Sequence, residues 1–401
     1  MRNTTKIFVS FAFLKESLEL FKDVIIEITG NYISNVKTNV LQDEVKEIEP
    51  SYRYNNCVLI PGFINGHIHI GDSFAKELGY NLKIDEIVKY PNGLKHYLLR
   101  TIDEEIVIEG IRNSMLEMLY NGITTFVDYR ENGVSGIKLL QKADLLFKKM
   151  YPEIELGKII LGRPDKSLDE LDDVLKYCDG VGLSSTNLYS DDELNEIKNI
   201  CKKHNKIISV HAAETKEEHF IAEKKYGNSD VYRALLVLEA NPIVHSIHIN
   251  KKDLWLIKSK KCGIVVCPRA NSYFGVGFPP IQEFISSDIP LCIGTDNVMA
   301  NSLNIFREFE YLIKYLRSVF GPKIINPLDV LRMATVNPAK IFKLEDRGWI
   351  DKNKRADFII LDLSSPHLQP MTKLAELIVL RAGPRDIKSV FLGGRCIETR
   401  K

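Results

Sequence analysis

The sequence predicts an α/β protein, a (β/α)₈ TIM barrel with a small β-sandwich domain built from both chain termini. Eight short, β-branched apolar runs alternate with helix-patterned stretches between about residues 59 and 345, which is typical of βα units and a parallel sheet. Polar residues follow these runs, as they do where barrel strands end at a catalytic face. The two ends of the chain contain strand-like segments without this alternation.

The eight predicted barrel strands follow one another along the chain. They are residues 57–69, 123–132, 158–165, 180–188, 206–215, 242–250, 263–271 and 289–297. Before the second strand, Ile108, Ile111 and Met115 recur at helical spacing, and Gly122 provides a C-terminal cap. These patterns predict a barrel domain over residues 59–345.

The flanking regions are predicted to form one composite β domain, residues 1–58 plus 346–401. Alternating apolar residues indicate strands at 6–14, 23–36, 356–363 and 388–398. Neither flank is long enough for its own core, so we expect the two to pair with each other in an antiparallel arrangement.

Composition and charge exclude several classes of function. The 401 residues carry 54 basic and 53 acidic side chains, a net charge of +1, which gives no attraction to nucleic acid or to an anionic membrane. No uncharged apolar stretch reaches the length of a membrane span, and Lys15 and Glu16 interrupt the first apolar segment, unlike a secretory signal. The seven cysteines are scattered without a CxxC pair, which predicts a reduced, cytoplasmic protein.

Imidazole and carboxylate side chains gather at the predicted strand ends. They are His67 and His69 on the first strand, His211 on the fifth, His245 on the sixth and Asp296 on the eighth. His67 and His69 are two residues apart, so both face the same side of the strand. Three or four imidazoles with one carboxylate suit a divalent ion such as Zn²⁺ or Fe²⁺.

Each of these residues also has a plain structural interpretation. An isolated HxH pair occurs in ordinary surface strands, and Asp296 could be a turn or N-cap residue. His204, His219 and His367 fall in helical or loop sequence, where a solvated or capping role is expected. The recurrence of histidine at the ends of the first, fifth and sixth predicted strands favours the metal interpretation.

Glu214 follows His211 by three residues, where the fifth strand opens into the predicted site. It could simply be a glutamate in the first turn of the next helix. Its position beside the candidate ligands instead favours a proton shuttle.

A further set of charged residues is predicted to bind the substrate. The set comprises Arg130 and Glu131 after the second strand, Arg269 after the seventh, and Lys95 and His96 in the long segment 71–103, which we expect to form a lid or pocket wall. Arg163 lies at the third strand end with no assigned role. Each could instead be part of a surface or rim ion pair. Together they suggest a substrate with a polar or anionic group.

Five motifs in order carry a family resemblance: PGFINGHIHIGDS, SVHAAET, VHSIHIN, VVCPRAN and IGTDN. The sequence resembles the amidohydrolase superfamily, in the branch of cytosine deaminase, guanine deaminase, S-adenosylhomocysteine deaminase and the triazine hydrolases. The resemblance covers essentially the whole chain, but the YRENG and GLKH stretches do not match the characterised deaminases.

The resemblance implies roles at matching positions. His67, His69, His211 and Asp296 would ligate one divalent ion, Zn²⁺ in the first place, with Fe²⁺ or Mn²⁺ as alternatives. His245 would contact the attacking water or the substrate, and His248 would be structural. Binuclear relatives carry a carboxylated lysine at the fourth strand end, where this chain has Ser184 and Ser185. A mononuclear site is therefore expected.

The leading functional prediction is hydrolytic deamination of an aminated heterocycle, such as a nucleobase or nucleoside. Asp296 would accept a proton from water, Glu214 would protonate the ring nitrogen, and His245 would stabilise the reacting oxygen. The alternative is hydrolysis of another C–N bond or a C–halogen bond, as in imidazolonepropionase or the triazine hydrolases. A structural protein that has lost its ligands is disfavoured because every ligand position is filled. By analogy, we expect a homodimer.

Overall fold

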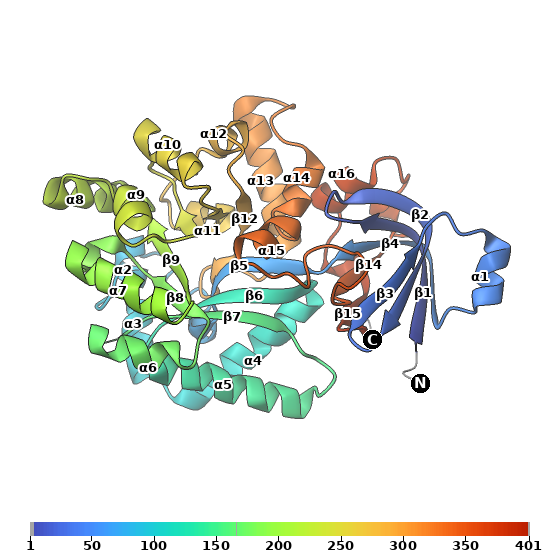
Figure 1. Cartoon of the computed structure of the whole chain (residues 1–401), viewed down its shortest axis with the longest axis horizontal. Coiled ribbons are helices and arrows are strands. Elements are labelled where there is room, and N and C mark those ends of the chain that lie inside the picture. The colour runs from blue at the N-terminus through green and yellow to red at the C-terminus, as the bar shows by residue number, and fades with distance from the viewer. Residues whose placement is uncertain (1–3, 166, 400–401) are drawn as a thin grey trace.

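The computed structural model describes residues 4–165 and 167–399, in which the strands form two separate sheets. The outermost residues of the predicted terminal domain, 1–3 and 400–401, lie outside the described part. One sheet belongs to the central region of the chain, and the other unites its two ends, which lie together on the right in Figure 1.

The central sheet consists of parallel strands in the order β12-β11-β10-β9-β8-β7-β6-β5-β13. The bounds are β5 Phe63–His69, β6 Ile123–Arg130, β7 Gly157–Gly162, β8 Gly180–Leu183, β9 Ile207–Ala212, β10 Ile243–His245, β11 Ile264–Val266, β12 Leu291–Ile293 and β13 Asp296–Asn297. Only residues 294–295 separate β12 from β13, which pairs with β5. The sheet curls, and its parallel strands agree with the predicted alternation of strands and helices.

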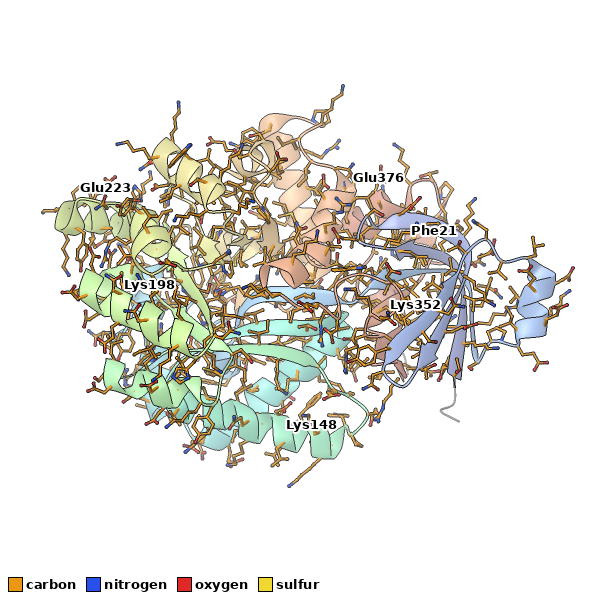
Figure 2. The ribbon with its side chains drawn as sticks, in the orientation of Figure 1. Phe21, Lys148, Lys198, Glu223, Lys352 and Glu376 are labelled. Atoms are coloured by element: carbon orange, nitrogen blue, oxygen red, sulfur yellow. The ribbon has the colours of Figure 1, made fainter. Side chains whose placement is uncertain are left out.

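Helices cover the outer face of the curled sheet (Figure 1). The longer ones are α4 Glu104–Tyr120, α5 Gly133–Met150, α7 Asp191–Lys203, α8 Lys216–Tyr226, α10 Lys251–Ser259 and α13 Ile305–Phe320. The shorter ones are α6 Leu171–Leu175, α9 Asp230–Tyr232, α11 Pro268–Tyr273, α12 Ile281–Ser286, α14 Pro327–Arg332, α15 Val336–Ile341 and α16 Leu374–Leu380. Their outward faces carry charged side chains such as Lys148 and Glu223 (Figure 2). Among the described residues, no helix is long and apolar enough to cross a membrane.

Apolar side chains fill the interior of the curled sheet. Val127, Ile159, Val244, Val265 and Cys292, from five different strands, belong to one buried cluster. Inward-pointing residues of neighbouring strands pack in this way in barrels, which makes the interior a solid core. The polar residues at the strand ends therefore lie next to this packed apolar core.

The first predicted strand, residues 57–69, is two strands that belong to different sheets. β4, Tyr52–Pro61, pairs with the terminal strands, and β5 begins at Phe63. Gly62 lies between them, and a Cβ atom there would be 2.3 Å from Oγ1 of Thr124. The break was missed because residues 57–64 on both sides of Gly62 form one apolar run in the sequence.

The terminal sheet has seven strands in the order β16-β15-β14-β4-β1-β2-β3. Its further elements are β1 Thr4–Leu14, β2 Glu19–Thr29, β3 Tyr32–Lys37, α1 Gln42–Ile48, β14 Phe358–Asp362, β15 Ile387–Leu392 and β16 Arg395–Glu398. The expected purely antiparallel arrangement is wrong, because β1 pairs in parallel with β4 and the sheet is mixed. The chain reaches that position through α1, a helical crossover that the flank's strand-like sequence did not indicate.

Candidate active site

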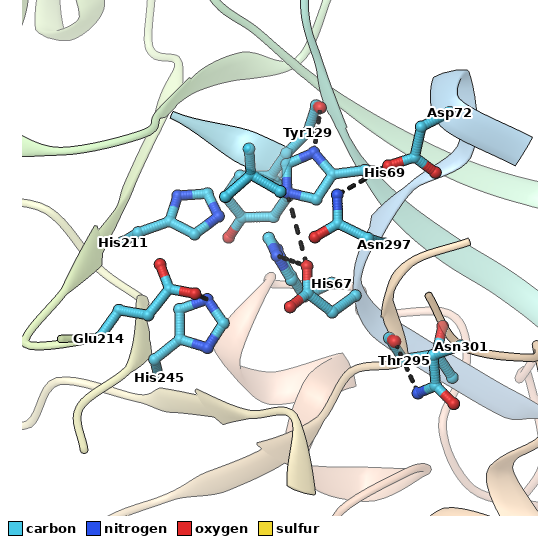
Figure 3. Close-up of polar contacts among 12 residues, drawn as sticks. His67, His69, Asp72, Tyr129, His211, Glu214, His245, Thr295, Asn297 and Asn301 are labelled. Atoms are coloured by element: carbon cyan, nitrogen blue, oxygen red, sulfur yellow. Dashed lines mark hydrogen bonds and ion pairs between the residues drawn. The ribbon is translucent and has the colours of Figure 1, made fainter. Parts of the chain in front are cut away.

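His67 and His69 lie at the carboxyl end of β5 and point into the mouth of the curled sheet. Their ring centroids are 4.9 Å apart, and the His67 ring is also 4.9 Å from that of His211 on β9. The alternation of side chains along a strand gives both residues the same direction. Figure 3 shows the imidazoles facing one another.

His211 and His245 complete the group from β9 and β10, with ring centroids 5.3 Å apart. Nδ1 of His211 is 2.8 Å from the carbonyl oxygen of Leu183, and Nδ1 of His69 is 3.1 Å from that of Tyr129. A carbonyl oxygen can only accept, so each Nδ1 donates its proton and leaves Nε2 bare. A bare Nε2 is the form of imidazole that ligates a metal.

Asp296 opens β13, and its Oδ1 lies 3.2 Å from Nε2 of His67 and 3.6 Å from Nε2 of His69. Burial opposes its ionisation, but the adjacent His67 outweighs this effect and lowers the pKa of Asp296. Asp296 and His245 have φ angles of 63° and 70°, in the left-handed region that non-glycine residues rarely adopt. Backbone strain of this kind concentrates at functional sites.

The donor set fits a divalent metal ion. His67 is fully buried; among the described residues its Nδ1 has no hydrogen-bond partner, and its Nε2 faces Oδ1 of Asp296 at 3.2 Å without hydrogen-bond geometry. Burial lowers the pKa of His67 to about 3, so the ring is neutral and able to ligate. His67, His69 and Asp296 present donor atoms within 4.8 Å of one another, as do His67, His211 and His245. A buried polar atom without a partner costs about 1–3 kcal/mol, and a metal ion would supply the missing partner.

Glu214 lies just beyond the end of β9, and its Oε1 is 3.5 Å from Nε2 of His245. Figure 3 shows its carboxyl group beside the His245 ring. Burial raises the pKa of Glu214, so the carboxyl group holds a proton more readily than an exposed glutamate. Nδ1 of His245 is 3.0 Å from Oδ1 of Asn271, which fixes the ring's orientation.

A cavity opens above these residues, and part of its wall comes from the segment between β5 and α4. That segment contains η1 Ile70–Ala75, α2 Ile84–Val88 and α3 Leu94–Thr101. The predicted substrate residues Lys95, His96 and Glu131 line the cavity, together with Arg163. The remaining lining residues are His69, Ile84, Asp85, Val88, Lys89, Tyr90, Ser184, Ser185, Leu188, His211, Glu214, Thr215, Glu218, His245, Asp296 and Asn297.

Arg130 and Arg269, which were also expected to contact substrate, do not line this cavity. The Arg130 guanidinium is buried against Gly71, where a Cβ atom would lie 1.6 Å from Nη2, and it donates to Oε2 of Glu131 at 3.1 Å. Arg269 donates to Glu308 and to Ser302. Both arginines donate hydrogen bonds to buried carboxylates or to neighbouring polar groups. Their positions at strand ends therefore did not predict which groups they contact.

Other histidines lie outside this group. Nε2 of His248 is 2.8 Å from the carbonyl oxygen of Val276, consistent with the expected structural role. His204, His219 and His367 each contact an aspartate away from the cavity.

The sequence interpretation did not identify Asn271 and Asp72, which contact His245 and Asn297, nor two further residues near the site. Asn297 lines the cavity and donates to Oδ2 of Asp72 at 2.7 Å. The Cys267 thiol lies within 4.8 Å of ligand atoms of His245 and Asp296. The signal was present, because Asn297 follows Asp296 directly and Cys267 lies within the seventh predicted strand segment, residues 263–271.

Comparisons with known proteins agree with this architecture. Residues 58–397 match the amidohydrolase family. An uncharacterised protein of Methanocaldococcus jannaschii is 41% identical over 76% of this chain and 78% of its own length. A 5-methylthioadenosine/S-adenosylhomocysteine deaminase of Pyrococcus horikoshii is 28% identical over 94% of this chain and 90% of its own. The structure of an adenosine deaminase from Xanthomonas campestris with bound zinc superimposes with a TM-score of 0.80 at 17% identity, covering 98% of this chain and 92% of the other. The chain belongs to the amidohydrolase family.

Proposed function

We propose that this protein is a zinc-dependent hydrolase that deaminates an aminated heterocycle at the mouth of a closed (β/α)₈ barrel. The observation that carries the proposal is the juxtaposition of Glu214, a carboxyl group whose pKa is raised by burial, with His245 at the edge of the metal-binding group. The deaminase named among the relatives and the zinc-bound adenosine deaminase that superimposes on the chain support the same reaction class.

Four ligands, His67, His69, His211 and Asp296, would hold one metal ion. The ion supplies Lewis-acid activation of water at neutral pH. No lysine follows β8, where Ser184 and Ser185 stand, and this supports a single ion.

The chain's own groups account for the proton transfers of deamination. Asp296 accepts a proton from the attacking water, and Glu214 donates a proton to the ring nitrogen next to the amino-bearing carbon. His245, fixed by Asn271, hydrogen-bonds the oxygen that adds to that carbon. Asp296 then passes its proton to the amino group, which leaves as ammonia, and the added oxygen returns its remaining proton to Glu214 as the ring carbonyl forms.

The cavity also supports a substrate with an anionic or strongly polar arm. Lys95 pairs with Glu131 and Lys89 with Asp85, whereas the Arg163 guanidinium has no hydrogen bond or ion pair with any described residue, although Arg163 is only 8% exposed. The guanidinium lies 5.5 Å from the ring centroid of Tyr90. The guanidinium therefore faces the cavity without a counter-charge from the chain, and an anionic group on the substrate would supply that charge.

Ammonia release from the zinc-loaded enzyme tests the reaction. The panel should contain aminated purines, pyrimidines and pterins, each with and without a carboxylate or phosphate arm. We expect release from one ring class, and more from its anionic members. Hydrolysis of an imidazolone or a chlorotriazine without ammonia release from any aminated ring would favour the alternative hydrolase.

A further inference from the structure

We propose that Lys95 and Glu131 form a buried ion pair that positions the metal-ligating imidazole of His69 and joins the cavity wall to the metal centre. The proposal rests on the metal site described above. Lys95 and Glu131 come from segments with different roles, because Lys95 lies on α3 of the cavity wall and Glu131 directly follows β6.

The first contact joins Glu131 to His69. Oε1 of Glu131 is 2.7 Å from Nδ1 of His69, and the carbonyl oxygen of Tyr129 is 3.1 Å from the same nitrogen. Both neighbours are acceptors, so the proton stays on Nδ1 and Nε2 remains bare, 3.6 Å from Oδ1 of Asp296. A carboxylate behind a ligating imidazole fixes the orientation of the ring and increases its basicity.

The second contact holds Glu131 in place. Glu131 is 1% exposed, and a buried carboxylate needs compensating charge. Nζ of Lys95, itself 3% exposed, contacts the same Oε1 that faces His69, whereas Arg130 reaches Oε2. Of the cationic side chains in the described chain, Lys95 is therefore the one that shares this oxygen with the imidazole.

The third contact links Lys95 to the other side of the metal centre. Nζ of Lys95 is 3.4 Å from Oδ2 of Asp72, and Asp72 accepts hydrogen bonds from Nδ2 of Asn297 and from the backbone N–H of Met299. Asn297 is the neighbour of Asp296 in the chain. Through Glu131 and Asp72, the Lys95 ammonium thus connects α3 to the two segments that carry His69 and Asp296.

Metal retention tests this inference without any substrate. We would load the full-length protein with Zn²⁺ or Co²⁺, and follow the transfer of the ion to a chelator and the visible spectrum of the Co²⁺ form. Glu131→Gln and Lys95→Met should each release the ion about 10–100-fold faster, in line with the effect of groups behind metal ligands. Their Co²⁺ spectra should shift because the His69 ring is less firmly oriented.

The pair itself is tested by a double-mutant cycle. The double variant should release the metal ion little faster than either single variant, because the two residues act through one another. Lys95→Arg, which keeps the charge, should retain the metal better than Lys95→Met, and this comparison remains informative if Lys95→Met folds poorly. The exposed pair Lys142 and Glu105 offers matched controls, Lys142→Met and Glu105→Gln.

Metal release within twofold of wild type in both single variants overturns the inference. Release that rises in only one single variant, or single effects that add in the double variant, also overturns it. A wild-type protein that retains no Zn²⁺ refutes the metal site itself, and with it the proposed function.

Discussion

Glu131 and Glu308 are both fully enclosed and both lie beside a buried or half-buried cation, yet their pKa values move in opposite directions. Burial favours the neutral form of each. At Glu131, Lys95, His69 and Arg130 outweigh burial and hold the pKa well below its usual range. At Glu308, burial prevails over Arg269, whose Nη1 is 3.4 Å from Oε1, and raises the pKa to about 7.

The difference lies in the number and closeness of the counter-charges. Glu131 has cationic or proton-donating neighbours on both oxygens, and it stays ionised behind His69. Glu308 has one guanidinium, the amide of Asn301 and a backbone N–H. Two glutamates of equal burial can therefore serve different purposes, one as a fixed anion near the metal site and the other as a hydrogen-bonded support for the loop after β13.

The largest effect is expected at Glu214, a partly buried carboxyl group, which has a raised pKa like Glu308 but lines the cavity. Glu214→Gln cannot donate a proton, so kcat should fall by about 10²–10⁴-fold. Zinc content should be unchanged, since Glu214 is not a ligand. Steady-state ammonia release and metal analysis check this, with the exposed Glu217→Gln on α8 as the control. A Glu214→Gln enzyme of normal kcat would remove the proposed proton donor.

A pH-dependent change in stability is expected from Glu308. Its pKa is raised in the folded protein from 4.5 to about 7, so its stabilising contribution is complete below about pH 4.5 and is lost as the pH rises through about 7. Glu308→Gln carries no such titration. Relative to wild type, the variant should gain about 3 kcal/mol in unfolding free energy between pH 4.5 and 8.

Urea unfolding at several pH values measures that difference. Glu310→Gln, on the same helix but exposed, should follow wild type at every pH. A difference between Glu308→Gln and wild type that stays constant with pH would show that Glu308 does not titrate in this range.

The sequence was most informative where function depends on periodicity and least informative where it depends on packing. Strand alternation predicted that His67 and His69 share a direction. Their position at predicted strand ends also predicted that His211, His245 and Asp296 lie close to them. No periodicity indicates which carboxylate an arginine will meet. Arg130 is held by Gly71 and Glu131, and Arg269 by Glu308, a residue 39 positions further along the chain. The break at Gly62 was missed for a similar reason, because the apolar residues on both sides of it form one run that is typical of a single strand.

The smallest expected effect is on substrate recognition, and it should differ between Arg163 and Arg269, two strand-end arginines in different surroundings. Arg163 lines the cavity without a charged partner, and Arg269 pairs with Glu308 outside it. If the substrate has an anionic arm, Arg163→Met should raise the KM for it about 10–100-fold, the value of a hydrogen bond to a charged group, and leave an analogue without the arm unaffected. Arg269→Met should leave the ranking of substrates unchanged while lowering thermal stability, because it leaves the buried carboxyl group of Glu308 without its cationic partner.

Initial-rate measurements with the paired substrates distinguish the two variants. A ranking altered by Arg269→Met but not by Arg163→Met would mean that the anionic arm is recognised elsewhere and that the unpaired guanidinium has another role.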